Sequence, residues 1–287
     1  MPHEPPHRPQ AASHFLGHHE ANPYFAFTDA CNAVRPVVIL ASGQACVWYH
    51  LALASKDGDW IVREEETALR MVRDELSRRG ACYRFGAPLD VRWLAGGWSS
   101  HFESIDAAGI RYRYDFVSRP PRLTPSQLQN MWSQVDFGAP AVVPKRELIL
   151  LKQTLRFKDY SFIGALATQL DEAEDQLRWT LDPQHVMELL AAHPELKSKL
   201  AQIRPALRDV FPLNAPHDLE AIAVAIDAEI RNLRRDDEKQ IMAYTTAMKP
   251  WAVQFRTLGL DHKSLSEAHD ACCVAAQDIL PYKVLPT

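Results

Sequence analysis

The sequence predicts an α+β fold, in which helices flank a mixed β-sheet and an all-helical region follows it. Up to about residue 120, short apolar runs rich in β-branched residues alternate with a helical pattern. From Pro144 onward almost only helical periods occur, interrupted at Pro183, Pro205, Pro212, Pro216 and Pro250. We therefore expect a disordered or loosely ordered tail over 1–23, an α/β core over 24–143 and a helical C-terminal domain over 144–287.

The composition narrows the class of protein. The 287 residues are 47% hydrophobic and 24% charged, as in globular domains, and the formal net charge is −4. Because nucleic acid is also negatively charged, avid non-specific binding to nucleic acid is not expected. The five cysteines show no CxxC spacing, which indicates reduced thiols. No window approaches the roughly 18 uninterrupted apolar residues of a membrane helix. We expect a cytoplasmic protein with no membrane partner.

The elements of the predicted core follow one another closely. RPVVILASG (35–43) is a continuous apolar run, typical of a strand buried on both faces. QACVWYHLAL (44–53) has no breaker and predicts a buried helix, and DGDWIV (57–62) predicts a second strand. EEETALRMVRDELSRRG (64–80) predicts an amphipathic helix, because acids fill its first turn and glycine ends it.

The rest of the core is predicted to be a strand and a hairpin. ACYRF (81–85) favours a strand, and WSSHFESID and GIRYRYDFVSRP favour two hairpin strands joined around 107–109. The proline-rich stretch 119–125 and a loop around 136–143 mark the change to helices.

Three aspartates are the candidate catalytic residues. Side chains alternate between the faces of a strand, so Asp57 and Asp59 share a face while Trp60 points the other way. In IRYRYDFV, Asp115 likewise lies opposite an aromatic face. Carboxylates converging from two strands repel one another unless a cation lies between them, and Mg²⁺ prefers oxygen ligands. The alternative is a solvated Asp-Gly turn.

A small-residue turn supplies a second part of the candidate site. Ser42 and Gly43 stand between the first strand and the following helix, where backbone N–H groups can approach a phosphate. Ser-Gly also simply begins helices. The chain has no GxSxG elbow, no Walker A loop and no dinucleotide-type GxGxxG.

These parts, in this order, resemble the nucleotidyltransferase-fold superfamily, and most closely the minimal nucleotidyltransferases of abortive-infection and toxin–antitoxin systems (AbiEii-like proteins). The resemblance covers roughly residues 35–170, through ILASGQA, KDGDWIV and YRYDFV. It implies that Ser42 and Gly43 contact the triphosphate and that Asp57 and Asp59 bind Mg²⁺ or Mn²⁺. Asp115 completes the triad, as a ligand or as the base for the acceptor hydroxyl.

LKQTLRFKDY resembles the lysine-bearing helix of the same family. At about 100° per residue, Lys152, Arg156 and Asp159 would fall within roughly 60° of one another. We expect Lys152, assisted by Arg156, to hold phosphate, with Asp159 orienting one of them. The alternative is a structural Arg–Asp pair. Arg113 is a further nucleotide-binding candidate, against the alternative of a solvated sheet edge. His101 and Glu103 share a strand face, where a structural histidine is the simpler interpretation.

The resemblance therefore predicts an enzyme that transfers a nucleoside monophosphate from an NTP to a hydroxyl of RNA (tRNA, for example), protein or a small molecule. A toxin-type enzyme with an antitoxin partner is one expected setting. The chain departs from the family pattern at Ser42, where many relatives carry glycine, and at Gln44, where a basic residue is usual. The second hypothesis is therefore a catalytically degenerate module that binds a nucleotide or protein partner.

Overall fold

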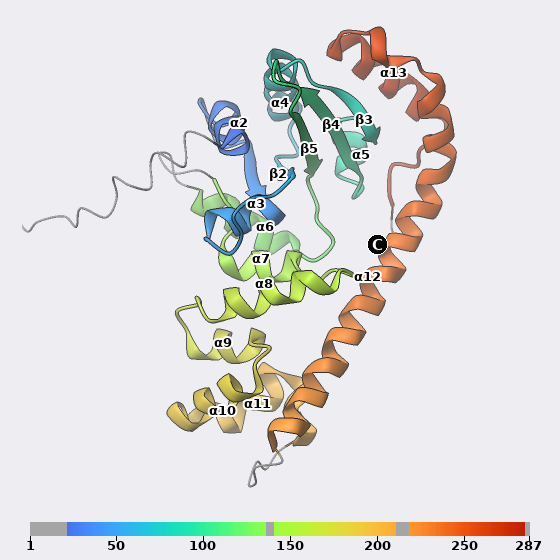
Figure 1. Cartoon of the computed structure of the whole chain (residues 1–287). Coiled ribbons are helices and arrows are strands. Elements are labelled where there is room, and N and C mark those ends of the chain that lie inside the picture. The colour runs from blue at the N-terminus through green and yellow to red at the C-terminus, as the bar shows by residue number, and fades with distance from the viewer. Residues whose placement is uncertain (1–21, 136–140, 211–217, 285–287) are drawn as a thin grey trace, which may run out of the picture.

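The structure is a computed structural model that describes residues 22–135, 141–210 and 218–284. It confirms the predicted fold class, a mixed sheet flanked by helices with a long C-terminal helical region (Figure 1). The predicted tail lies outside the described residues except for its last two, of which Pro23 already begins a helix. Pro212 and Pro216 also lie outside them.

The sheet has five strands in the order β1-β2-β5-β4-β3. They are β1 (Val38–Ala41), β2 (Asp57–Val62), β3 (Cys82–Gly86), β4 (Ser99–Ile105) and β5 (Arg111–Val117). β2 and β5 are parallel, and the other neighbours are antiparallel. The end of β1 therefore lies beside the beginning of β2, and β5 runs next to it. Each of the strands predicted from the sequence is present.

The helices that accompany the sheet are short. They are α2 (Pro23–Cys31), α3 (Ser42–Trp48), α4 (Glu66–Arg78), α5 (Val91–Leu94), α6 (Pro125–Gln134), α7 (Lys145–Leu151) and α8 (Phe157–Ala167). The helical region continues with α9 (Ala173–Trp179), α10 (Pro183–Ala192), α11 (Glu195–Ile203), η2 (Pro205–Val210), α12 (Asp218–Thr257), η3 (Leu260–His262) and α13 (Leu265–Ala276). Among the described helices, none has the length and apolar character needed to cross a membrane.

One face of the sheet is aromatic and fully covered. Trp60 stacks between Tyr114 and Phe116 at ring distances of 5.9 and 5.3 Å, and its Nε1 donates a hydrogen bond to Thr28. Helices α2, α4 and α13 cover this face, in one apolar core with the end of α12. Burial of these aromatic rings provides much of the driving force that orients the strands. The acids of the same strands consequently point to the other face.

The other face is covered over only part of its length. Ile39 and Ile61 pack in a second apolar cluster with α3, α6, α7 and α8. Asp59 and Asp115 lie on the same face, two residues from Ile61 and Val117 respectively. The aspartates therefore stand where the covering helices end.

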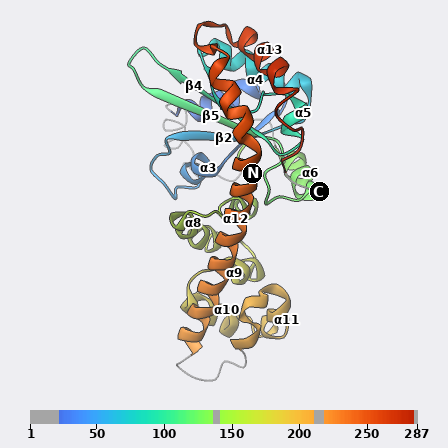
Figure 2. The same ribbon diagram turned by 90° about the vertical axis from the view of Figure 1, so that its right-hand side faces the viewer.

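Helix α12 connects the two ends of the molecule (Figures 1 and 2). Its 40 residues span about 60 Å. The predicted break at Pro250 is wrong, because the helix continues through this residue to Thr257. Tertiary contacts support the helix there: Trp251 is fully buried and donates a hydrogen bond from Nε1 to the carbonyl of Gly86 at 2.8 Å.

Two other segments differ from the sequence prediction. The helix expected over 44–53 begins and ends earlier, at Ser42 and Trp48, and His50 has a positive φ of 60° beyond its end. The stretch before Pro144 contains the unpredicted α6, and 141–143 runs along β1. There, the backbone N–H of Leu40 donates a hydrogen bond to the carbonyl of Ala141 at 2.7 Å. The segment 141–143 thus covers the edge of the sheet at β1.

Candidate active site

The three candidate carboxylates lie on one face of the sheet. Asp59 stands directly opposite Asp115 in the parallel β2–β5 register, and Asp57 precedes Asp59 by two residues. Residues opposite each other in register share a face, and so do residues two apart along a strand. The charges of Asp115 and Asp57 both act on Asp59. The structure therefore places the three acids that the sequence singled out on one face, with Asp57 and Asp115 both within electrostatic reach of Asp59.

The pKa of Asp59 departs clearly from its ordinary value. Burial, followed by the charges of Asp115 and Asp57, raises the pKa of Asp59 to about 6. The charge of Lys152 and a hydrogen bond from Ser42 act in the opposite direction without cancelling this effect. The ionised form of this carboxylate is thus unfavourable in the protein alone, and a nearby cation would stabilise it.

Asp115 is held by two neighbouring strands. Nη2 of Arg84 on β3 and Nδ1 of His101 on β4 lie 3.0 and 2.7 Å from its Oδ1. Burial would raise the pKa of Asp115, but the adjacent His101 and the Arg84 guanidinium outweigh it, so the pKa lies below its ordinary value. Asp115 therefore remains ionised at neutral pH.

A chain of polar side chains continues from Asp115 to α12. Ser99 Oγ lies 2.7 Å from Nε2 of His101 and 2.7 Å from the hydroxyl of Tyr244. Sequence reasoning set His101 aside and overlooked Arg84, Ser99 and Tyr244. Alternation along a strand indicates from the sequence that Ser99 and His101 share a face. The register that sets His101 opposite Asp115 depends on the pairing of β4 with β5, and no local sequence pattern predicts that register.

The turn from β1 into α3 lies next to Asp59. Ser42 adopts a left-handed backbone with φ of 49°, which costs a non-glycine residue about 1 kcal/mol, and its side chain helps to lower the pKa of the nearby Asp59. A Cβ on Gly43 would lie 2.2 Å from Oγ of Ser55. The buried Gln44 donates to the carbonyl of Ser55 at 2.9 Å. Gly43 and Gln44 thus pack this turn against the segment that leads into β2.

Lys152, Arg156 and Asp159 do meet, but not on one helix. The predicted helix is wrong, since α7 ends at Leu151 and α8 begins at Phe157. The buried Asp159 accepts hydrogen bonds from Lys152 Nζ at 3.3 Å, Thr154 at 2.6 Å and Arg156 Nε at 2.8 Å. Lys152 is 3% exposed and its charge also acts on Asp59, so it links Asp159 to the triad. Arg156 remains 57% exposed.

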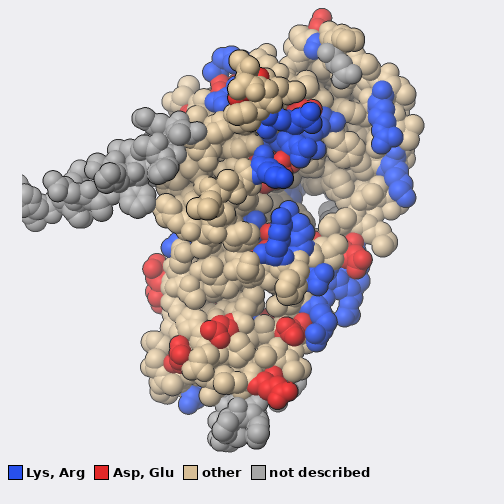
Figure 3. All heavy atoms as spheres, in the orientation of Figure 1, with Lys and Arg blue, Asp and Glu red and all other residues tan. Residues whose placement is uncertain are grey.

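Arg113 lies beside the triad and pairs with it. Its Nη1 is 3.4 Å from Oδ1 of Asp57, with both side chains about 40% exposed. Arg84 pairs with Asp115, and the charge of Lys152 acts on Asp59, so further basic side chains lie near the acids; on the face drawn in Figure 3, lysine and arginine side chains also gather in several groups. The surface around the acids is thus suited to an anionic ligand.

The donor types of the triad suit a divalent ion with oxygen ligands. Asp57, Asp59 and Asp115 offer carboxylate oxygens on one face, but among the described residues they are not a group whose ligand atoms all lie within 4.8 Å of one another, so their side chains would draw closer around a shared ion. Mg²⁺ and Mn²⁺ both prefer such ligands.

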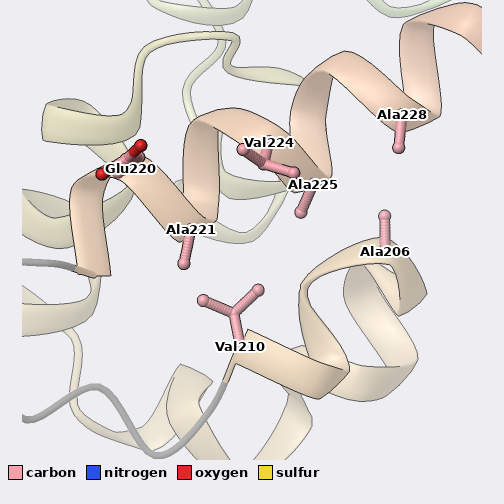
Figure 4. Close-up of a pocket in the computed structure, with 7 residues that line it drawn as sticks. All are labelled: Ala206, Val210, Glu220, Ala221, Val224, Ala225 and Ala228. Atoms are coloured by element: carbon pink, nitrogen blue, oxygen red, sulfur yellow. The ribbon is translucent and has the colours of Figure 1, made fainter.

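A separate hollow lies at the far end of the molecule. It has a volume of about 490 Å³ and lies between η2 and the beginning of α12, where Ala206 and Val210 face Ala221, Ala225 and Ala228 (Figure 4). Its lining is almost entirely apolar, with Glu220 as its one charged residue. It offers no group that could take part in the chemistry of the acids.

Comparison with known proteins gives two distant structural likenesses. No family model matches the chain, and no curated protein matches it. A putative nucleotidyltransferase from H. pylori has 15% sequence identity and a TM-score of 0.38, over 79% of this chain and 98% of that chain. JHP933 from Helicobacter pylori has 16% identity and a TM-score of 0.38, over 82% and 98%. Because both TM-scores are low, neither likeness decides the fold family or the activity.

Proposed function

We propose that the protein is a metal-dependent nucleotidyltransferase. An acceptor hydroxyl attacks the α-phosphorus of an NTP and loses its proton to solvent, an acceptor–phosphate bond forms, and the bond to pyrophosphate breaks. The observation that carries the proposal is the register of β2 and β5, which sets Asp59 opposite Asp115 with Asp57 on the same face. Like charges that meet on neighbouring strands, where Asp59 is desolvated, are costly in a purely structural role.

The acids are proposed to differ in their roles. Asp57 and Asp59 would hold Mg²⁺ or Mn²⁺, which when bound polarises phosphate oxygens and neutralises charge on the departing pyrophosphate. Asp115, whose pKa lies below its ordinary value, suits a metal ligand better than a general base. Arg84 and His101 would keep its carboxylate oriented.

The proposed triphosphate contacts come from the elements that end beside the triad. Ser42 and Gly43 offer backbone N–H groups and a hydroxyl, and the buried Lys152 offers a fixed positive charge. Arg113 pairs with Asp57 across 3.4 Å and is 39% exposed, so its guanidinium would be available to a phosphate beside the triad. Arg156 keeps one side of its guanidinium in solvent, where it would reach the outer phosphates.

The acceptor remains open among RNA (including tRNA), protein and small molecules, and a toxin-type enzyme with an antitoxin partner remains the proposed setting. To test the activity, we would incubate the protein with each labelled NTP, Mg²⁺ and cell lysate or total RNA, and follow the transferred label. Asp59→Asn should abolish transfer with the fold intact, whereas Asp74→Asn, an exposed acid on α4, should leave it unchanged. Equal labelling by wild type and Asp59→Asn would refute the proposal.

The alternative is a degenerate binding module. It is favoured by two observations: Ser42 is strained where glycine would not be, and Gln44 is fully engaged in packing rather than available to phosphate. Calorimetric titration of ATP with and without Mg²⁺ separates the two proposals. An enzyme should show metal-dependent nucleotide binding, whereas a protein-binding scaffold should show none.

A further inference from the structure

A second cluster of metal-ligating side chains lies where α13 meets the sheet. His269 and Cys273 are four residues apart on α13 and therefore share a face. Asp90 faces them from the N-cap of α5. One ligand atom from each residue lies within 4.8 Å of the others, and both α13 side chains are buried. The proposed nucleotidyltransferase chemistry uses none of the three.

The spacing of the ligand atoms matches that of a tetrahedral ion. Cys273 Sγ lies 3.5 Å from Nε2 of His269 and 3.9 Å from Oδ2 of Asp90. With zinc–sulfur bonds of about 2.3 Å and zinc–nitrogen or zinc–oxygen bonds of about 2.0 Å, tetrahedral ligands stand about 3.5 Å apart. The thiol–imidazole distance already equals this value, and the thiol–carboxylate distance exceeds it by a few tenths of an ångström.

The surroundings support His269 as a ligand. Its Nδ1 lies 2.9 Å from the hydroxyl of Tyr83, which is itself held by the N–H of Leu89 at 3.0 Å. Metal-binding histidines commonly use their second nitrogen in such a bond, which fixes the ring. Nε2 is therefore the nitrogen that faces Cys273.

Asp90 retains capacity for a cation although it already binds Arg92. Arg92 donates from Nε to Oδ1 and from Nη2 to Oδ2, both at 2.9 Å. A carboxylate has about four lone-pair positions, so Oδ2 can accept a further partner. In the metal-free protein, Cys273 Sγ contacts His269 and Asp90 only at 3.5 and 3.9 Å. The metal-free cluster is then a weak contact between a thiol, an imidazole and a carboxylate.

We propose that Asp90, His269 and Cys273 bind Zn²⁺. Thiolate and imidazole ligands select zinc over Mg²⁺, which prefers oxygen alone. On binding, Cys273 loses its thiol proton to solvent, and the imidazole proton resides on Nδ1, facing Tyr83. The ion would join α13 to the segment between β3 and α5, two parts of the chain about 180 residues apart. It would thereby fix the C-terminal helices to the sheet.

Cobalt substitution tests this proposal, because tetrahedral Co²⁺ bound to thiolate gives a charge-transfer band that oxygen ligands do not give. Wild type should show the band, Cys273→Ser should lose it, and Cys272→Ser should retain it. Cys272 is a matched control, since it is an adjacent buried thiol outside the cluster. In competition with a chromophoric chelator, zinc affinity should fall by about 100-fold or more in Cys273→Ser.

Further variants separate this site from the acid triad and from a folding defect. Asp90→Asn keeps an N-cap side chain and should also weaken zinc binding. Asp57→Asn/Asp59→Asn should retain the full cobalt band, so the two sites fail or succeed independently. A wild-type protein without a thiolate band at excess Co²⁺, or a band that survives in Cys273→Ser, would overturn the proposal and leave a hydrogen-bonded contact alone.

Discussion

Replacing Asp59 with asparagine should make the metal-free protein more stable at neutral pH. The amide has the shape of the carboxylate without its charge. The pKa of Asp59 is raised from 3.8 to about 6 by burial and by the charges of Asp115 and Asp57. At 1.36 kcal/mol per unit, a shift of about 2 units makes ionisation in the folded state cost about 3 kcal/mol. Asp59→Asn should remove that cost and raise the free energy of unfolding by about this amount.

The pH dependence gives the sign of the effect. Well below pH 4 the Asp59 carboxyl is protonated in both folded and unfolded chains, so it imposes no cost. Between about pH 4 and 6 the unfolded chain releases the proton first, and wild-type stability falls as pH rises. Above pH 6 the full cost is present. The advantage of Asp59→Asn should therefore grow through this window and then remain constant.

Urea denaturation in EDTA at pH 4, 5 and 7.5 measures the difference. Asp57→Asn is a matched control, because Asp57 is 41% exposed and its removal should change metal-free stability much less. Mg²⁺ or Mn²⁺ at ten times its dissociation constant should stabilise wild type by about 1.4 kcal/mol and neither variant. The electrostatic reasoning would be refuted if Asp59→Asn were no more stable than wild type at pH 7.5. It would also be refuted if the difference in the free energy of unfolding between the two proteins were the same at every pH.

Three further predictions concern the turn and the polar chain. Ser42→Gly should raise the free energy of unfolding in urea by about 1 kcal/mol, because glycine tolerates a φ of 49°; an unchanged midpoint would contradict this. Gly43→Ala should cost about 1–3 kcal/mol through contact with Ser55, and Ser55→Gly should restore most of the loss in a double-mutant cycle. Tyr244→Phe removes the hydroxyl that holds Ser99, and through Ser99 it should lower the rate of nucleotide transfer about tenfold. The free energy of unfolding should change by less than about 1.5 kcal/mol. A loss of activity no larger than the loss of folded protein would indicate that the hydroxyl is merely structural.

Local patterns in the sequence were sufficient for the strands and for the face on which each acid lies. Alternation along a strand is a consequence of backbone geometry, so Asp57 and Asp59 had to share a face opposite Trp60. Burial of that tryptophan then decides which face is turned outward. The fold class follows from the same patterns.

Helix boundaries and the lysine site were not predictable in this way. A helical period over LKQTLRFKDY placed Lys152 and Asp159 on one face of a single helix. In the structure, α7 ends before Lys152 and α8 begins at Phe157, and the two side chains pair across the segment between these helices. Likewise, Pro250 stays inside α12 because Trp251 anchors the helix to the sheet. Long-range packing outweighs local propensity at both places.

The sequence alone established which residue types were present for metal and phosphate chemistry, and that each acid lay on the uncovered side of its own strand. Only the tertiary structure decided that β5 inserts beside β2, which sets Asp115 opposite Asp59 and draws in Arg84, His101 and Tyr244. Strand orientation follows from covalent geometry within a few residues. Strand order depends instead on the burial of apolar side chains far apart in the chain, which leaves no local trace.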